Sequence, residues 1–353
     1  MVDFVTSESD GTIRMWVWDE SSEPRVLYEH KTEKESWFHC VAVSADGRLA
    51  VTTHDKYAYL WSMVTGQQVA ILQGFDCMAT GASISAELVA VASEAYEYEQ
   101  TDKKIRLYKH DGTLVRTLEC HSGDVCDVSF SSDGKRLVSS SYDMTARVWD
   151  VTVGTALLTL KHPSSVWSVA WSPCGDNIAT ACGDNNGRVW DAANGKQIVT
   201  LIGHTSWVAS VAYSFDGTHI VTGSNDGTVR LWRATDGTVE FVLNGHLDCR
   251  WIWAVSFSAD GRFLASASND KTTRIWDVAT GSCLHVLQQG SRCLGVSFNR
   301  VNKHALRKQQ DAMFAVAILC DQKETDPFLP REVWSECLNN ISWLDFVQKD
   351  TLL

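Results

Sequence analysis

A motif of about thirty residues recurs along this chain, and its periodicity constrains the fold more than any other feature. The clearest copy reads GHTSWVASVAYSFDGTHIVTGSNDGTVRLW, from Gly203 to Trp232. Three further full copies end at Asp150, Asp191 and Asp277, weaker copies end at Trp61 and Tyr108, and a half copy ends at Trp16. The closing aromatic residues fall at positions 16, 61, 108, 149, 190, 232 and 276, so the period runs from 41 to 47 residues. Repeats of this length indicate a small structural unit that buries its faces against its neighbours.

Each copy predicts a four-stranded antiparallel sheet. VASVAYS, HIVTGS and TVRLW are short runs of β-branched and aromatic residues, separated by the turn formers FDG and NDG. A fourth strand, such as KQIVTL, crosses each boundary between copies. An isolated sheet would leave both faces and its edges exposed, whereas radial repetition around a channel stacks the faces. The repeat therefore predicts an all-β ring of sheets.

The combination of GH near one end of a copy and WD near the other, at this period, resembles the WD-repeat family. The resemblance covers about residues 2 to 300. It implies a WD-repeat β-propeller over residues 1–300, and the seven closing aromatic residues predict seven blades. We expect no cofactor, and we expect residues 301–353 to form a short α-helical C-terminal tail.

A set of polar residues keeps a fixed spacing within the copies. An Asp precedes the closing aromatic residue by six positions, a Ser or Thr lies four residues before that Asp, and a His precedes the Asp by 22 or 24 residues. In the family these positions form a hydrogen-bonded chain inside each blade, which the resemblance assigns here to His121, Asp143, Trp149, His162, Asp184, Trp190, His204, Asp226, Trp232, His246, Asp270 and Trp276. The copy ending at Trp61 departs from the pattern with Val51 at the Ser/Thr position, and the next copy has Phe75 at the His position.

A Ser, His and Asp set also suggests a hydrolase. We reject that interpretation because the set recurs in four full copies, and each Ser or Thr is expected inside a sheet. A catalytic triad occurs once and needs a nucleophile that is open to substrate. The sequence also has no P-loop, no GxSxG and no metal-ligand cluster. We therefore expect a protein that is not an enzyme.

Closure of the ring is predicted from the two ends of the repeat region. RCLGVSFN, from Arg292 to Asn299, has the pattern of an inner strand, but no GH or WD follows it. The chain start supplies the other strands of a blade, around Phe4–Ser7, Thr12–Trp16 and from Val26. We expect one blade to be shared between the N-terminus and residues 292–299, which closes the ring at seven. The alternative is that the N-terminus is a fragment of a longer array.

The segment after about residue 300 has helical periodicity in two stretches, KHALRKQQDAMFAVAILCD and LPREVWSECLNNISWLDFV. The second stretch is similar to the opening of an F-box, and loosely to the Leu-Pro helix of a SOCS box. That resemblance implies a substrate receptor of a cullin-type ubiquitin ligase, with an adaptor bound to the tail. The competing interpretation is a pair of helices that pack on the propeller.

Charge and composition restrict the partners. The net charge of −12 argues against binding a phosphate backbone. The acidic start MVDFVTSESD does not have the pattern of a signal peptide, and the longest apolar run, Ala312–Leu319, is too short to span a bilayer. Eleven Cys without a CxxC pair indicate reduced thiols. We expect an intracellular, cytoplasmic protein with no membrane contact, and the nucleus stays open.

The remaining function is an interaction scaffold for a protein or peptide. Family members most often bind partners on the face around the channel entrance, through residues at the start of each inner strand and just before the turn Asp. Carried over to this sequence, these positions hold Trp37, Tyr142, Trp167, Trp207, Trp251 and Trp253. Trp and Tyr dominate interface hot spots, so these six are the candidate partner-binding residues. For Trp167 and Trp253 the alternative is packing between neighbouring blades.

Overall fold

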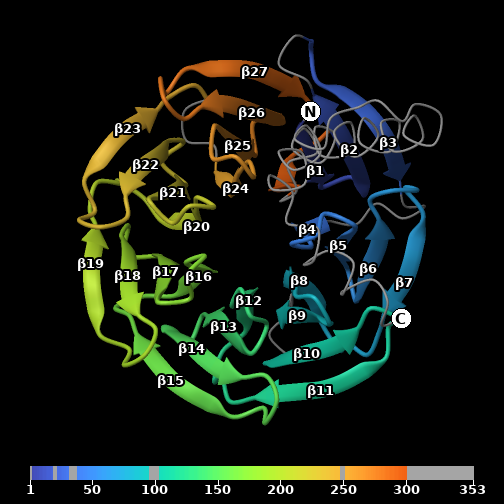
Figure 1. Ribbon diagram of the computed structural model, residues 1–353, viewed down its shortest axis with the longest axis vertical. Coiled ribbons are helices and arrows are strands. Elements are labelled where there is room, and N and C mark those ends of the chain that lie inside the picture. Colours follow the sequence, from blue (N-terminus) through green and yellow to red (C-terminus); the bar gives the residue numbers. More distant parts are fainter. Residues whose placement is uncertain (1, 19–21, 32–37, 95–102, 247–250, 300–353) are drawn as a thin grey trace, which may run out of the picture. The chain divides into compact units, whose positions relative to one another are not determined.

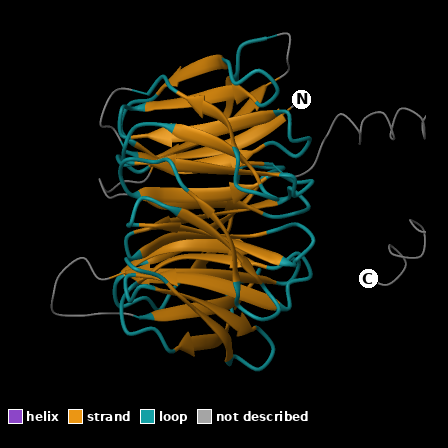
Figure 2. Cartoon of the chain, turned by 90° about the vertical axis from the view of Figure 1, so that its left-hand side faces the viewer, coloured by secondary structure: helices purple, strands orange, loops and turns teal. Residues whose placement is uncertain are grey.

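The computed structural model describes residues 2–18, 22–31, 38–94, 103–246 and 251–299. Every regular element in these ranges is a β strand, and the strands form seven four-stranded antiparallel sheets, which are arranged in a ring (Figure 1). Seen from the side, the strands lie across the thickness of the ring and the turns lie on its two faces (Figure 2). The predicted seven-bladed propeller is therefore confirmed. The predicted tail, residues 301–353, lies outside the described residues.

The sheets are called blades I to VII, and each is given from its inner to its outer strand. The first four blades are β28 (Cys293–Phe298), β1 (Val2–Glu8), β2 (Thr12–Trp18) and β3 (Arg25–Lys31) in blade I; β4 (Phe38–Val43), β5 (Leu49–His54), β6 (Tyr57–Ser62) and β7 (Gln68–Leu72) in blade II; β8 (Met78–Ile84), β9 (Leu88–Glu94), β10 (Lys104–Lys109) and β11 (Leu114–Glu119) in blade III; and β12 (Val125–Phe130), β13 (Arg136–Ser141), β14 (Thr145–Asp150) and β15 (Ala156–Lys161) in blade IV.

The other three blades continue the ring in chain order. They are β16 (Val166–Trp171), β17 (Asn177–Cys182), β18 (Gly187–Asp191) and β19 (Gln197–Leu201) in blade V; β20 (Val208–Tyr213), β21 (His219–Ser224), β22 (Val229–Arg233) and β23 (Val239–Leu243) in blade VI; and β24 (Ile252–Phe257), β25 (Phe263–Ser268), β26 (Thr272–Asp277) and β27 (Cys283–Gln288) in blade VII. No helix in the described ranges is long and apolar enough to span a membrane.

The turn between the first two strands of blade VI shows how the sequence sets the hairpins. Gly217 has a φ of 73°, which a residue without Cβ adopts at little cost, and its N–H donates to the Ser214 carbonyl over 3.0 Å. The Ser214 hydroxyl donates to Asp216 over 2.6 Å and accepts from the His219 N–H over 2.9 Å. The SFDG segment thus satisfies its own polar groups where the ladder ends.

The apolar cores lie between neighbouring blades. One core joins Ala179, Val189 and Leu201 of blade V to Val211, Ile220 and Trp232 of blade VI. Each blade therefore buries one face against the blade before it and the other face against the blade after it. A single blade would leave these faces in water, so the ring provides the burial that stabilises every unit.

Blade I closes the ring with strands from both ends of the repeat region. β28 pairs with β1 in antiparallel register, Phe4 lies opposite Phe298, and their rings meet edge to face with centroids 5.4 Å apart. Beyond the ladder the Asn299 N–H donates to the Asp3 carbonyl over 2.7 Å. The first strand of the chain, β1, thus binds the last inner strand, β28, and closes the ring.

The spaced polar residues form a hydrogen-bonded chain in blades IV, VI and VII. In blade VI, Trp232 Nε1 donates to Thr222 Oγ1 over 2.8 Å, His204 Nε2 lies 2.7 Å from the same oxygen, and His204 Nδ1 lies 2.9 Å from Asp226 Oδ2. The corresponding groups are Trp149, Ser139, His121 and Asp143 in blade IV and Trp276, Ser266, His246 and Asp270 in blade VII. The Ser or Thr is fully buried in each case, as a structural role requires.

Blade V departs from the expected chain, and this corrects the pairing that the 22-residue interval predicts for His162 and Asp184. Trp190 and His162 both reach Thr180, but His162 Nδ1 faces the Leu160 carbonyl at 3.0 Å. Asp184 instead forms an ion pair with Arg188. In blades VI and VII the residue before the His is glycine, and a Cβ on Gly203 would stand 2.5 Å from a guanidinium nitrogen of Arg230.

The residue after His162 differs from its counterparts. Ser122 and Thr205 donate their backbone N–H groups to Asp143 and Asp226, whereas Pro163 has no N–H to donate, and Asp184 pairs with Arg188 instead. Blade II also corrects the sequence alignment. Trp61 Nε1 donates to Thr52 Oγ1 over 2.8 Å, so Thr52 rather than Val51 is the acceptor. His54 pairs with Tyr57 across a two-residue turn, which shifts the spacing by one residue.

Candidate functional site

The candidate residues lie at one end of the inner strands. In blade IV, Val125 at the start of β12 pairs with Ser141 at the end of β13, so the residues before β12 and after β13 lie on the same face. Equivalent registers join Val208 to Ser224 in blade VI and Ile252 to Ser268 in blade VII. Tyr142, Trp167, Trp207, Trp251 and Trp253 therefore belong to one rim of the channel.

These five rings form a continuous series across blades IV to VII. Tyr142 meets Trp167 edge to face with centroids 5.1 Å apart, and Trp167 stacks on Trp207 at 5.6 Å and an interplanar angle of 21°. The series continues from Trp207 to Trp251 at 6.3 Å, and from Trp251 to Trp253 at 4.8 Å. We call these five residues the aromatic arc.

The aromatic arc is partly open to solvent. Trp207 is 44% exposed, and the other four rings are partly buried. Trp167 and Trp253 are partly buried and line the channel, and Trp167 also packs between Tyr142 of blade IV and Trp207 of blade VI. Trp253 is also oriented, since its Nε1 donates to Asn269 Oδ1 over 2.8 Å. Trp37 lies outside the described residues.

Backbone hydrogen bonds hold this rim in the same way in successive blades. The carbonyls of Asp124, Ser165, Trp207 and Trp251 accept from the N–H groups of Tyr142, Gly183, Asn225 and Asn269, at 3.1, 2.9, 2.9 and 3.0 Å. In blade V a Cβ on Gly183 would lie 3.3 Å from Trp167 Nε1. Glycine at this position thus leaves room for the indole to lie against the turn. These hydrogen bonds fix the backbone at the four rim positions before a partner binds.

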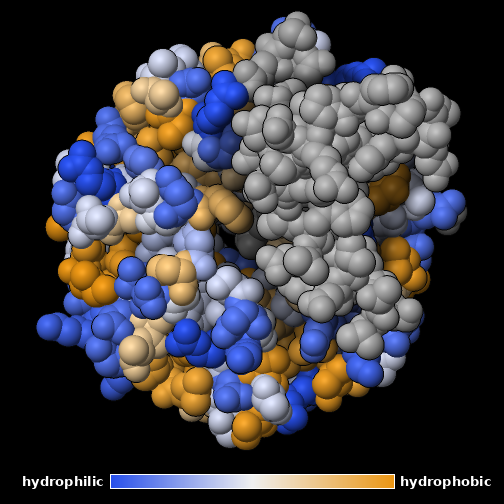
Figure 3. Space-filling view, viewed as in Figure 1, coloured by the Kyte–Doolittle hydropathy of each residue, from blue (hydrophilic) through white to orange (hydrophobic). Residues whose placement is uncertain are grey.

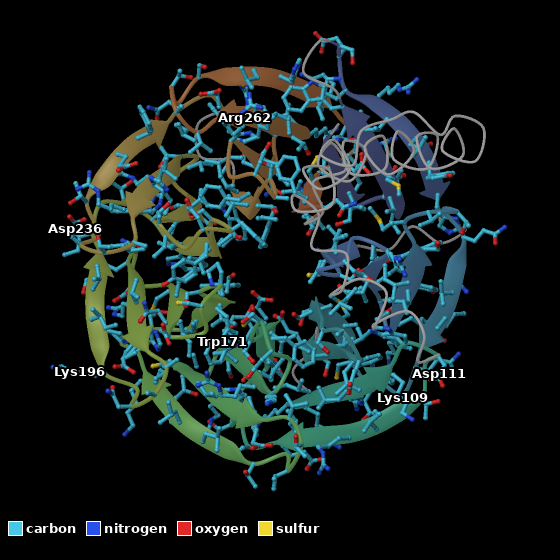
Figure 4. The ribbon with its side chains drawn as sticks, viewed as in Figure 1. Lys109, Asp111, Trp171, Lys196, Asp236 and Arg262 are labelled. Carbon is cyan, nitrogen blue, oxygen red and sulfur yellow. The ribbon has the colours of Figure 1, made fainter. Side chains whose placement is uncertain are left out.

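The channel beneath the arc has a volume of about 570 Å³. One face of the ring is hollowed at its centre in Figure 3, and Figure 4 places Trp171, at the far end of β16, beside the channel. Polar side chains on the inner strands tie the channel wall together. Ser168 and Ser210 accept from the Val211 and Val255 N–H groups of the next blade, at 3.4 and 3.2 Å.

Asp127 on β12 is a charged member of this wall. Its Oδ2 accepts from the Ser168 hydroxyl over 2.9 Å and from the Val169 N–H over 3.2 Å, which joins blade IV to blade V. Burial raises the pKa of its carboxyl to about 6, against the opposing effect of these hydrogen bonds. Asp127 is therefore an interblade brace.

Glu94 also belongs to the site, although the repeat pattern does not predict it. Ser93 pairs with Ala79 as Ser141 pairs with Val125, so Glu94 holds the rim position in blade III that Tyr142 holds in blade IV. The insertion that follows Glu94 breaks the repeat, so counting from the closing aromatic residue gives no residue for this position. Alignment on the end of β9 finds it.

The structure does not favour a catalytic interpretation of the repeated Ser, His and Asp sets. Ser139, Thr180, Thr222 and Ser266 are fully buried and already hydrogen-bonded, so none is open to substrate. Within the described ranges, no three His, Cys, Asp or Glu side chains come together where they could hold a metal ion.

A ring of seven such blades, closed by strands from both ends of the repeat region, defines the protein as a β-propeller. Five segments match the family model described as WD domain, G-beta repeat, at residues 22–62, 112–150, 154–191, 195–233 and 237–277. These matches cover more than half of the chain, so it belongs to the WD-repeat family.

Curated relatives resemble parts of the chain. Nuclear distribution protein nudF of Aspergillus niger is 30% identical over 171 residues, which are 44% of this chain and 38% of that protein. The beta subunit of a guanine nucleotide-binding protein of Oryza sativa is 31% identical over 137 residues, or 38% and 35% of the two chains. A subunit of chromatin assembly factor 1 of Gallus gallus is 34% identical over 94 residues, or 26% and 17%. The match spans less than half the length of each of these relatives.

Proposed function

We propose that this protein is a non-catalytic interaction scaffold whose aromatic arc binds a protein or peptide partner. The observation that carries the proposal is the unbroken series of five aromatic rings on one rim of the channel. Large aromatic side chains that are partly exposed and fixed in place supply binding energy at a small entropic cost.

The relatives support this class of function. The relatives from Oryza sativa and Gallus gallus are both named as subunits, and so work together with other chains. WD-repeat propellers generally bind protein partners. The partner of this chain is not implied by theirs, because only part of each relative is matched.

The test is selection of binders from a random dodecapeptide library displayed on phage, with the full chain as bait. Affinities of selected peptides are then measured by calorimetry for the native chain and for a Trp207→Ala, Trp251→Ala double variant. We expect the double variant to lose about 2–4 kcal/mol of binding free energy, which is about a 30-fold or greater loss of affinity.

Phe215→Ala is the matched control. Phe215 is 61% exposed and lies in the turn after β20, on the opposite face of the ring. It should leave peptide affinity unchanged, and thermal unfolding should show that all variants remain folded. Selection of no peptide, or of peptides that bind the double variant as tightly as the native chain, contradicts the proposal.

A further inference from the structure

The aromatic arc ends at Tyr142 in blade IV, beside two carboxylates, Glu94 of blade III and Asp124 of blade IV. Tyr142 lies between the aromatic rings and these carboxylates. Its ring contacts Trp167, its hydroxyl hydrogen-bonds to Glu94, and its backbone N–H donates to the backbone carbonyl of Asp124 over 3.1 Å. Glu94 holds the equivalent rim position in the preceding blade. We call Glu94 and Asp124 the acidic end of the arc.

These groups lie close together at the channel entrance, since Tyr142 hydrogen-bonds to Glu94 and the Asp124 charge acts on both. Burial raises the pKa of Glu94, hydrogen bonding with Tyr142 lowers it, and the Asp124 charge raises it further. Burial also raises the pKa of the Tyr142 hydroxyl, and Cys126, Glu94 and Asp124 act in the same direction. Each carboxylate thus disfavours ionisation of its neighbours, which is a local excess of negative charge.

The surroundings supply little positive charge. Among the described residues that line the channel, Glu94 and Asp127 are charged and none is Lys or Arg. The described turns of this face in blades IV to VI, at 120–124, 142–144, 162–165, 183–186, 202–207 and 225–228, also contain no Lys or Arg. In blade III, which holds Glu94, Lys104 and Arg106 lie on β10 and pair with Glu119 and Asp76. The chain as a whole carries a net charge of −12. The site therefore fits a ligand that brings positive charge with it.

We propose that the acidic end of the arc binds a lysine or arginine side chain of the partner, and that its cationic head lies near Glu94 and Asp124, against Tyr142 and Trp167. This inference rests on the proposed function and specifies the kind of segment that the arc takes, a basic peptide. The aromatic faces attract a cation through their quadrupoles, and the carboxylates provide charged hydrogen-bond acceptors. The apolar stem of either side chain matches the rings along its length.

The geometry favours a basic side chain over other ligand groups. A phosphate or carboxylate would meet the acidic end with like charge, at a cost in binding. An apolar side chain would bury the Glu94 carboxylate further without providing a partner for its charge. A divalent metal ion is the other cationic ligand, and the experiment includes it as a contradicting outcome.

The experiment uses small probes on the full chain, so it does not depend on a known partner. N-acetyl-arginine methylamide is titrated into ¹⁵N-labelled protein, and the indole N–H resonance of Trp167, assigned with a Trp167→Phe variant, reports binding. N-acetyl-citrulline methylamide has nearly the same shape without the charge. We expect saturable millimolar binding of the arginine probe and at least about tenfold weaker binding of the citrulline probe.

Two variants assign the effect to the acidic end. Glu94→Gln should weaken binding of the arginine probe by about tenfold, because it removes one carboxylate without changing the side-chain size. Tyr142→Phe keeps the ring and should retain most of the binding. If Glu94→Gln does not fold, Asp124→Asn replaces it. Equal binding of the two probes, no binding of the arginine probe, an unaffected glutamine variant, or a larger response to magnesium chloride than to arginine would each overturn the inference.

A failure of this inference can be distinguished from a failure of the proposed function. The Trp207→Ala, Trp251→Ala double variant leaves the acidic end intact, so it should still bind the arginine probe. Some selected peptides could lose affinity in the double variant yet keep their affinity when all their own Lys and Arg residues are replaced. That result would support the scaffold function and contradict the proposal of a basic ligand. Binding of the arginine probe without any arc-dependent peptide would contradict the scaffold function instead.

Discussion

Replacing Asp226 by alanine tests how the blades are held together. Asp226 Oδ2 lies 2.9 Å from His204 Nδ1 and accepts from the Thr205 N–H over 3.0 Å. Its Oδ1 accepts from the Thr228 N–H over 2.9 Å and from the Thr228 hydroxyl over 2.7 Å. The His204 side chain is completely buried, so without Asp226 its Nδ1–H keeps only the more distant Thr228 hydroxyl, 3.3 Å away, as an acceptor.

The magnitude follows from these contacts. A hydrogen bond to a charged group contributes about 1.5–3 kcal/mol, and a buried donor without an acceptor costs about 1–3 kcal/mol. Thr205 is exposed, so its N–H regains solvent, and the four contributions do not add fully. We expect the free energy of unfolding to fall by about 3–4 kcal/mol in Asp226→Ala. Asp226→Asn retains an acceptor for His204 and should lose about 1 kcal/mol.

Blade V offers the matched control. In Asp184→Ala, His162 keeps the Leu160 carbonyl and the Thr180 hydroxyl, and Arg188 is long enough to turn toward water. The expected loss is about 1–2 kcal/mol. Urea unfolding, followed by tryptophan fluorescence at neutral pH, measures both variants. Equal losses in the two blades, or a loss below about 1 kcal/mol in Asp226→Ala, would show that the His–Asp pair is not what stabilises the blade.

Two further predictions concern pH and close packing. Burial lowers the pKa of His162 to about 4 from 6.5, so the unfolded chain binds the proton first and stability is lost as pH falls from about 6.5 to about 4. His162→Gln should remove up to about 3 kcal/mol of that dependence, measured by urea unfolding across this range, and an unchanged slope would contradict it. Gly81→Ala places a Cβ 2.4 Å from the Asp127 Cα, so it should destabilise by about 3 kcal/mol or more. The Cβ of Gly203→Ala meets the movable end of Arg230 at 2.5 Å and the Trp232 ring at 3.4 Å, so it should cost about 1 kcal/mol, and similar thermal shifts in both variants would refute the distinction.

The fold could be predicted because several independent features of the sequence indicate the same repeat. Periodic aromatic residues, strand patterns and turn glycines all predict the same four-stranded unit, and a ring is the arrangement that buries both faces of such units. Ring closure at seven also follows from residue patterns, since the orphan inner strand and the N-terminal strands complete one sheet. These features depend on local sequence, which is present in the chain itself.

The parts that could not be predicted depend on contacts between positions that vary from copy to copy. The interval between His162 and Asp184 is the same as in blade VI, but Pro163 offers Asp184 no backbone N–H such as Thr205 gives to Asp226, and Asp184 pairs with Arg188 outside the chain of hydrogen bonds. A shorter turn in blade II moves Thr52 out of the expected spacing by one residue, and the longer connection in blade III removes Glu94 from that spacing. Counting residues finds the average blade, whereas the register of each hairpin decides which side chain occupies a given place.

The hydrogen-bonded chain and the aromatic arc are linked through the loop that precedes β20. Asp226 binds His204 and the Thr205 N–H, and Trp207 follows two residues later with its carbonyl held by the Asn225 N–H. Asp226 therefore holds the segment before β20, and its neighbour Asn225 holds the Trp207 carbonyl. These contacts keep Trp207 in place although its side chain is 44% exposed. Loosening this loop costs affinity through lost preorganisation even when the folded ring persists. In native conditions, Asp226→Ala should consequently weaken arc-dependent peptides more than Asp184→Ala does, because Trp167 in blade V is positioned by stacking and by Gly183 rather than by Asp184. Equal peptide affinities in the two variants would show that the rim is rigid without the buried chain beneath it.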